Sequence, residues 1–108
     1  MSNQLENIAN SVGGWIIGNF EPSAHRTEEF EVAYKTYVAG DMEAEHYHQI
    51  ATEFTLIAYG KVEMLGEIYP QGSIVKVEPG QSTSFRALED SATVVVKIPS
   101  LPNDKYFK

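Results

Sequence analysis

The stretch GDMEAEHYHQIATEFTLIAYG, from Gly40 to Gly60, decides how this sequence is interpreted. It places His46 and His48 one residue apart and Glu53 five residues after the second histidine, between two glycines. Side chains along a strand alternate between its faces, so the two histidines point the same way, with Cα atoms about 6.7 Å apart. We expect Glu53 to begin a following strand that pairs antiparallel with the histidine strand. The sequence therefore predicts a metal site of two imidazoles and one carboxylate, which leaves coordination positions open.

The ligand atoms that the sequence offers limit the identity of the ion. The chain contains no cysteine, so any metal must be held by nitrogen and oxygen atoms. Two imidazoles and one carboxylate suit iron, manganese, nickel, zinc or copper, whereas calcium and magnesium prefer shells made only of oxygen. A His-x-His pair alone is more often part of a core than a pair of ligands. The complete five-position pattern arises by chance only about once in ten thousand such chains, which favours a metal site.

The rest of the sequence indicates an all-β protein of one domain, residues 1–108. Short segments rich in β-branched and aromatic residues alternate with turn signals, and no long helix is predicted. Residues 1–14 are predicted to form an N-terminal arm or short helix, because Leu5, Ile8 and Val12 share one helical face. The predicted strands are Trp15 to Phe20, Phe30 to Ala39, Ala44 to His48, Glu53 to Tyr59, Val62 to Met64, Glu67 to Tyr69, Ser73 to Val77, Thr83 to Leu88 and Thr93 to Ile98.

The opening stretch also matches the first motif of the cupin superfamily position by position. The segment GSIVKVEPGQSTSF resembles the second cupin motif: Gly72 opens a strand, Pro79-Gly80 makes a turn, and Thr83 stands where the family carries a fourth ligand, a histidine. The flanks GWIIGNF and VKIPSLPNDKY resemble those of small single-domain cupins. The resemblance implies a small jelly-roll barrel of six to eight strands, with its core at residues 30–98 and the metal facing its centre.

Thr83 is the departure from the family pattern that matters for the site. A hydroxyl is a weaker ligand than imidazole, so the three remaining ligands would leave a position for water or substrate. The alternative is that the metal has been lost and a polar pocket retained. His25 is the one other histidine, and it lies in a polar turn, where a solvated loop residue is the expected role.

Strand parity predicts which side chains surround the site. An inward-facing Glu53 carries Thr55 and Tyr59 to the same face of their strand. For residues 30–38, we favour the parity that keeps Glu31 and Lys35 out of the interior, because buried charges are costly. The predicted pocket residues are therefore Thr83, Tyr34, Thr36, Thr55, Tyr59 and Phe85. Apolar side chains mixed with hydroxyls suit a small, partly polar organic molecule.

Charge and hydropathy limit the partners. The net charge is −7 and the basic residues are scattered, which argues against nucleic acid. No apolar run approaches the roughly 20 residues that span a bilayer, and the N-terminus lacks the pattern of a secretory signal. A cytoplasmic protein is therefore expected. Phe54 and Leu56 should face outward from the barrel, which predicts either a homodimer or a cover formed by a terminal segment of the same chain.

Three functions remain open from the sequence. The first is a metal-dependent enzyme, oxygenase-like or isomerase-like, in which Tyr34, Tyr59 or Thr83 positions the ligand or relays a proton. No second inward carboxylate or histidine is identified, which argues against sugar epimerase chemistry. The second is a non-catalytic barrel that binds a small molecule, with or without metal. The third, a metal-free structural domain, is disfavoured by the complete first motif.

Overall fold

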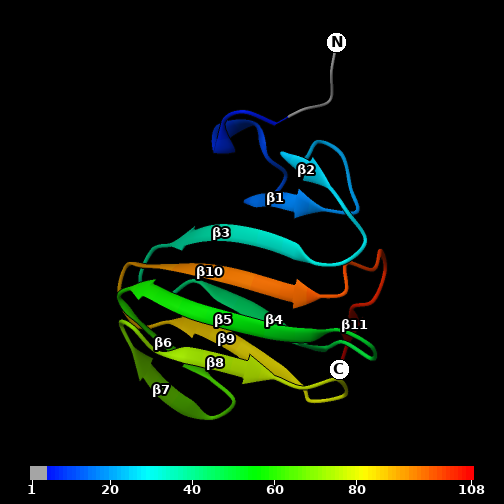
Figure 1. Ribbon diagram of the computed structural model, residues 1–108. Coiled ribbons are helices and arrows are strands. Elements are labelled where there is room, and N and C mark those ends of the chain that lie inside the picture. The colour runs from blue at the N-terminus through cyan, green and yellow to red at the C-terminus, as the bar shows by residue number, and fades with distance from the viewer. Residues whose placement is uncertain (1–4) are drawn as a thin grey trace.

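The computed structural model describes residues 5–108, which form two facing β-sheets (Figure 1). One sheet has six strands in the order β2-β1-β3-β10-β5-β8, and the other has five in the order β11-β4-β9-β6-β7. The strands are β1 Trp15–Gly18, β2 His25–Arg26, β3 Glu31–Tyr37, β4 Met42–Tyr47, β5 Thr52–Tyr59, β6 Lys61–Met64, β7 Glu67–Pro70, β8 Ile74–Val77, β9 Thr83–Ala87, β10 Ser91–Ile98 and β11 Tyr106–Phe107. The predicted all-β jelly roll is confirmed.

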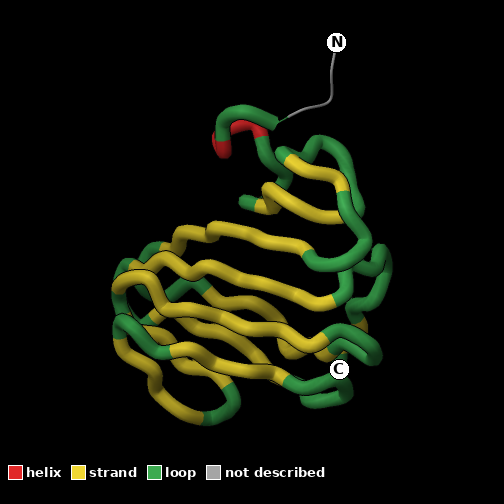
Figure 2. The backbone as a smooth tube through the Cα atoms, in the orientation of Figure 1, coloured by secondary structure: helices red, strands yellow, loops and turns green. Residues whose placement is uncertain are grey.

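Each of the nine predicted strands corresponds to a strand of the structure, with small shifts at the ends. The two strands that were not predicted, β2 and β11, have two residues each, too few to give a periodic signal. Within the predicted arm, Ile8–Asn10 forms a 3-10 helix, η1, and Asn7 caps it by accepting a hydrogen bond from the Ala9 N–H. Residues 1–4 of that arm lie outside the described residues. Strand and loop account for most of the chain in Figure 2, and no helix within residues 5–108 is long and apolar enough to cross a membrane.

The expected pairing of the histidine strand with the glutamate strand was wrong. Strand β4 pairs with β9 and β11, whereas β5 pairs with β10 and β8, so the two strands belong to opposite sheets. The chain crosses from one sheet to the other between Tyr47 and Thr52. The imidazoles and the carboxylate therefore meet across the interior of the barrel instead of side by side on one sheet.

The apolar core occupies one part of the space between the sheets. Its buried members come from β5, β6, β8 and β9, with Tyr37, Leu65 and Tyr69 packed against them. They are Ile57, Val62, Met64, Val75, Val77, Phe85 and Ala87. Because this cluster fills only part of the interior, the remainder is left to polar side chains and a cavity.

The predicted inner face of residues 30–38 was wrong. In β3 the inward side chains are Glu31, Ala33, Lys35 and Tyr37, while Tyr34 is 36% exposed and Thr36 is also exposed. The rule against buried charge fails here because both charges have partners inside the barrel. The Lys97 ammonium lies 3.1 Å from Glu31, and Lys35 lies 3.8 Å from Glu43.

The parity predicted for β5 holds only over its first part. Glu53, Thr55 and Ile57 face the interior, but Tyr59 is 43% exposed, so its predicted place in the pocket was also wrong. The cause is a bulge in β5: Ile57 and Tyr59 pair with the consecutive residues Thr93 and Ala92 of β10, so Ala58 is the extra residue and the end of β5 is rotated.

Gly60, the last glycine of the opening stretch, follows this bulge with φ +88°. A Cβ atom there would approach the Asp90 carbonyl oxygen to 2.4 Å and the Ser91 hydroxyl to 2.2 Å. Only glycine combines this backbone conformation with so close a neighbour. The motif glycine is therefore required by the tight passage from β5 to β6.

Candidate metal centre

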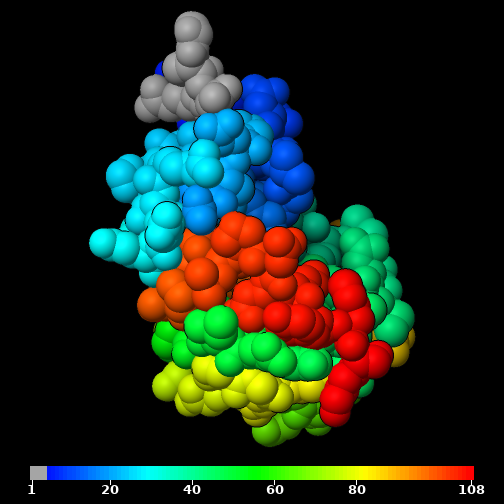
Figure 3. Space-filling view, turned by 90° about the vertical axis from the view of Figure 1, so that its right-hand side faces the viewer, coloured from blue at the N-terminus to red at the C-terminus, as the bar shows by residue number. Residues whose placement is uncertain are grey.

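A cavity of about 450 Å³ lies between the sheets, next to the apolar core. Side chains of β3, β4, β5 and β10 form its walls, and Trp15 and Phe20 of the N-terminal segment line it as well. The C-terminal segment closes another side through residues 101–105. Figure 3 shows this segment, in red, lying across the surface beside β10. Both termini thus contribute to the enclosure of the cavity.

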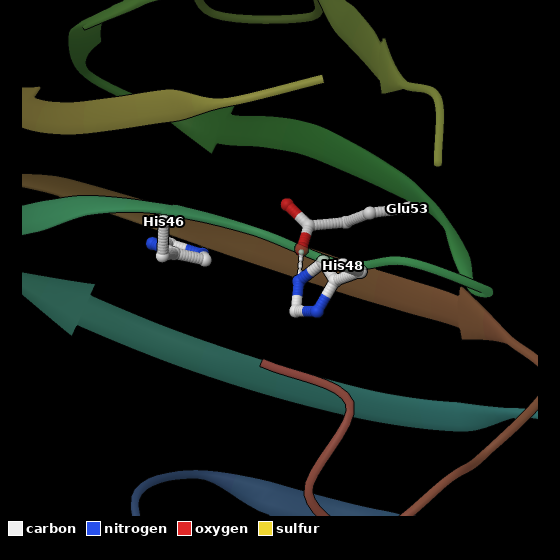
Figure 4. A group of neighbouring side chains, drawn as sticks. All are labelled: His46, His48 and Glu53. Atoms are coloured by element: carbon white, nitrogen blue, oxygen red, sulfur yellow. Dashed lines mark hydrogen bonds and ion pairs between the residues drawn. The ribbon is translucent and has the colours of Figure 1, made fainter. Parts of the chain in front are cut away.

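His46, His48 and Glu53 come together in this cavity (Figure 4). One potential ligand atom of each residue lies within 4.8 Å of those of the other two. All three residues are buried, with 8%, 4% and 9% of their surface exposed. Two imidazole nitrogens and one carboxylate oxygen at this separation can coordinate one ion and leave further positions open.

The backbone determines which imidazole nitrogens face the centre. The Nδ1–H of His46 donates to the carbonyl of Ala44 at 2.9 Å, and the Nδ1–H of His48 donates to the carbonyl of Asp104. A carbonyl only accepts hydrogen bonds, so Nδ1 carries the proton in both rings. Each Nε2 is then free to coordinate, as in metal sites whose ligands are oriented by a second layer of hydrogen bonds.

The contact between His48 and Glu53 is compatible with a cation held by both residues. His48 Nε2 lies 3.3 Å from Glu53 Oε1, and without a proton these two atoms are both hydrogen-bond acceptors. Their approach in a buried site requires either a proton on Nε2 or a positive ion beside both atoms. The Thr55 hydroxyl donates to the other carboxylate oxygen at 3.1 Å, which fixes the orientation of the Glu53 side chain.

The electrostatic surroundings favour the protonation states that bind metal. Burial lowers the pKa of His46 below its ordinary value of 6.5, so this ring is neutral at pH 7. Burial alone would raise the pKa of Glu53, but the hydrogen bond and charge of a protonated His48, with help from Thr55 and Lys97, lower it overall; a cation bound at Nε2 would supply positive charge in place of that proton. A neutral imidazole and an ionised carboxylate are the forms that coordinate a divalent ion.

Asp104 supports the site from the C-terminal segment, and no sequence pattern predicted this role. Its carboxylate accepts hydrogen bonds from the backbone N–H groups of Gln49, Ile50 and Ala51, at 2.9, 3.2 and 2.9 Å. Burial would raise the pKa of Asp104, but these three bonds lower it below its ordinary value of 3.8. The residue therefore holds the crossing between β4 and β5, while its carbonyl orients His48.

Thr83 lies opposite His46 in the pairing of β4 with β9 and lines the cavity. Its hydroxyl accepts a hydrogen bond from the Leu65 N–H at 3.1 Å and donates to the Ser84 carbonyl at 2.7 Å. Thr83 stands where the second cupin motif carries a fourth ligand, and its hydroxyl is already hydrogen-bonded to backbone groups. His25, the other histidine considered, is exposed on β2 and does not line the cavity.

Of the six predicted pocket residues, Thr55, Thr83 and Phe85 line the cavity, and Tyr34, Thr36 and Tyr59 do not. Among the polar residues that line it without having been predicted are five that belong to the charged face of β3 or are partners of that face. These residues are Glu31, Lys35, Tyr37, Glu43 and Lys97. The interior therefore holds further carboxylates, those of Glu31 and Glu43, which could not be identified from the sequence.

Tyr37 and Glu43 form a hydrogen-bonded pair in this wall. The Tyr37 hydroxyl donates to Glu43 Oε2 at 2.7 Å, and its ring packs on Phe85 with 4.5 Å between centroids. Burial, together with the negative charge and hydrogen bond of Glu43, raises the pKa of Tyr37 far above its ordinary value of 10. The phenol therefore keeps its proton at neutral pH.

Comparison with solved structures identifies the fold. A protein of unassigned activity with a double-stranded β-helix domain, from Klebsiella pneumoniae, matches with a TM-score of 0.68 at 21% identity, over 75% of this chain and 71% of its own. DMSP lyase DddQ from Ruegeria pomeroyi matches with a TM-score of 0.72 at 18% identity, over 87% of this chain and 49% of its own. The pirin YhhW from Escherichia coli, in complex with nickel(II), matches with a TM-score of 0.66 at 15% identity, over 81% and 39%.

The protein has the cupin fold, a double-stranded β-helix. It spans about half of the lyase and about two fifths of the pirin that it matches. No protein-family model and no curated protein matches the sequence, so the likeness is one of structure.

Proposed function

We propose that this protein binds a divalent transition metal at His46, His48 and Glu53 and takes a small, partly polar organic molecule into the adjoining cavity. The proposal is supported chiefly by the orientation of the two imidazoles, whose Nδ1 atoms are both engaged by backbone carbonyls. This leaves both Nε2 atoms directed to the site. The ions that fit are iron, manganese, nickel, zinc and copper, and a pirin of the same fold is known with nickel(II).

The residues around the centre support an enzyme that transfers protons. An ion held at this site would act as a Lewis acid toward an oxygen atom of the bound molecule. Glu43 accepts the hydrogen bond of Tyr37, so after the phenol has delivered its proton to the molecule, a proton that the carboxylate takes up from water can restore the phenol. This pair takes the role that Tyr34, Tyr59 and Thr83 were expected to fill. We therefore favour isomerase-like or lyase-like chemistry over oxygenation.

A non-catalytic binding barrel is the second candidate. It is favoured by the raised pKa of Tyr37, because a phenol that holds its proton so firmly can serve as a fixed hydrogen-bond donor. The two candidates differ in one measurement. An enzyme converts members of a substrate panel with multiple turnovers, and a Tyr37→Phe variant loses that turnover while it retains the metal.

Metal binding should stabilise the folded protein. Protein treated with a chelator and then given one of the five ions at about a thousand times its Kd should gain about 4 kcal/mol. For a domain of this size the corresponding rise in Tm exceeds about 10 °C. Differential scanning calorimetry measures it, with magnesium as the matched control ion. Unchanged Tm values with all five ions would contradict the proposal.

A second copy of the chain is proposed to cover the outer face of the six-stranded sheet. Across this face Tyr34, Val94, Leu56 and Ile74 occupy one continuous row of paired positions on four neighbouring strands. Leu56 is 36% exposed and Ile74 is 70% exposed. An apolar row of this length on an outer sheet face favours burial against a partner. The predicted homodimer thus involves the face of Leu56.

The substitution Leu56→Lys should therefore convert a dimer into a monomer, because it places a charge in the centre of the proposed interface. Size-exclusion chromatography with light scattering measures the change. The control is Ile68→Lys, which alters an equally apolar side chain, 61% exposed, on β7 of the other sheet. A wild-type protein that is monomeric at high concentration would contradict the prediction.

A further inference from the structure

We propose that the cavity contains a second ligand-binding position, formed by Lys35 and Thr93, which binds a carboxylate group of the small molecule. This inference rests on the proposed function, because the end of the molecule opposite the carboxylate would face the proposed metal centre. The position is built by neighbouring strands, β3 and β10, and both residues line the cavity.

The first observation is an unsatisfied hydroxyl. Thr93 is fully buried, and among the described residues its Oγ1 is the one buried side-chain polar atom without a hydrogen-bond partner. Burial of an unpaired hydroxyl is costly, and valine would fill the same space without that cost. A hydroxyl retained at such a position, facing a cavity, is expected to bond to a molecule that enters the cavity.

The second observation is a lysine whose ammonium is only weakly paired. Lys35 lies directly opposite Thr93 in the register of β3 and β10, which puts their Cβ atoms about 5 Å apart. Its nearest acidic partner, Glu43, lies 3.8 Å away, beyond normal hydrogen-bond distance. The ammonium stands over the ring of Trp15 at 5.2 Å, which supports the charge but accepts no hydrogen bond from it in the usual geometry.

Lys97 provides the contrast within the same wall. It also stands over the Trp15 ring, at 5.3 Å, but its ammonium lies 3.1 Å from Glu31. The other oxygen of that carboxylate accepts a hydrogen bond from Ser100 at 2.6 Å. Lys97 therefore belongs to a closed ion pair, whereas Lys35 retains donors for a ligand.

Glu43 does not compete strongly for Lys35, because it already accepts the hydrogen bond of Tyr37 through the same Oε2. The Tyr37 hydroxyl also lies near Thr93, close enough for that threonine to offset part of the rise in the Tyr37 pKa, yet Thr93 forms no hydrogen bond with it. A carboxylate between Lys35 and Thr93 would thus lie beside the proposed proton donor.

The charges of the cavity select a monoanion. Lys35 is the half-buried ammonium that is free for a ligand; the exposed Lys105 also lines the cavity, as do Glu21, Glu31, Glu43 and Glu53. At this position Lys35 supplies one positive charge and Glu43 lies 3.8 Å from it, so a single carboxylate is balanced, whereas a second negative charge would be repelled by Glu43. A cavity of about 450 Å³ accommodates a small molecule. The class that fits is a short hydroxy acid or oxo acid, with its carboxylate at Lys35 and its second oxygen toward the metal centre.

Trp15 is the only tryptophan of the chain and lines the cavity beside Lys35, so its fluorescence reports on this position. The metal-loaded protein is titrated with 3-hydroxypropanoate, 3-hydroxybutanoate and 4-oxopentanoate, each beside its neutral amide, and with inorganic phosphate. We expect at least one acid to bind about 10- to 100-fold more tightly than its amide. Phosphate is expected to bind no better than the amides.

Two variants test whether Lys35 and Thr93 bind the carboxylate. Lys35→Met should weaken binding of that acid about 10- to 100-fold and leave the amide unaffected, whereas Lys76→Met, which removes an exposed lysine over Phe54, should change neither. Thr93→Val should weaken the acid about threefold to tenfold and raise Tm by about 4 °C, because an unsatisfied hydroxyl is removed. Its control, Thr36→Val, alters an exposed threonine of β3.

Metal analysis of the same samples separates this inference from the proposed function. If the protein holds metal but binds acids and amides equally, or if Lys35→Met leaves acid binding unchanged, the carboxylate position is overturned and the metal site stands. If Thr93→Val lowers Tm, the hydroxyl has a structural partner and the argument from Thr93 fails. Absence of metal together with Lys35-dependent binding of the acid would overturn the metal proposal alone.

Discussion

The double substitution His46→Ala/Glu53→Ala should abolish transition-metal binding. Wild-type protein purified without chelators should carry about one ion per chain, and the variant should carry none above background. The reason is that the substitution removes two of the three ligand atoms that lie within 4.8 Å of one another and leaves a single imidazole. Elemental analysis of untagged protein measures both, before and after reconstitution with iron, manganese, nickel, copper and zinc.

Two further variants serve as controls for changes in the fold and for metal bound by other histidines. His46→Gln/Glu53→Gln keeps the approximate shape of both side chains, so a loss of metal in this variant cannot be attributed to cavities in the fold. His25→Ala removes an exposed histidine of β2 and should retain the full metal content. The proposal fails if wild type and variants take up the same amount of metal, or if none takes up any.

The substitution Asp104→Asn should destabilise the protein and weaken metal binding together. The side chain accepts three backbone hydrogen bonds as an anion, and an asparagine must turn an amide N–H toward at least one of the same donors. We expect a loss of about 3 kcal/mol in the free energy of unfolding. Metal affinity should fall about 10- to 100-fold, because the carbonyl that orients His48 belongs to the same residue.

The pH dependence distinguishes this mechanism from a general loss of packing. The pKa of Asp104 is lower in the folded state than its ordinary value of 3.8, so its contribution to stability is present above that pH and is lost as the pH falls through the folded-state pKa. The difference between wild type and Asp104→Asn should therefore be largest near neutral pH and shrink below pH 3.8.

Urea denaturation of the metal-free proteins at several pH values measures this difference. The matched control is Asp90→Asn, at an exposed turn where the carboxylate accepts one backbone hydrogen bond, from Ala39. It should cost about 1 kcal/mol or less. A stability difference for Asp104→Asn that does not change with pH would show that the charge of this carboxylate is not what holds the crossing.

The spacing of Gly40, His46, His48, Glu53 and Gly60 matches the first cupin motif, and that resemblance implied the fold and the three residues that meet in the cavity. Local geometry accounts for part of the pattern: strand alternation sets the direction of the histidines, and a glycine is needed where β5 turns into β6. The alternation of short strands and turns likewise predicted nine of the eleven strands. Strand positions and the direction of side chains within a strand depend on local geometry, so the sequence alone predicts them.

Tertiary structure decided what surrounds the site. The face of β3 that is buried depends on partners outside that strand, since Lys97 pairs with Glu31, and the Trp15 ring and, more weakly, Glu43 lie beside Lys35. The bulge in β5, which forms in its pairing with β10 and turns Tyr59 outward, and the hydrogen bonds of Asp104 to residues 49–51 are also long-range. The sequence determined the ligands because neighbouring residues supply them. The cavity is formed by pairings between strands that are far apart in the sequence. The stability of such pairings cannot be predicted from a local sequence pattern.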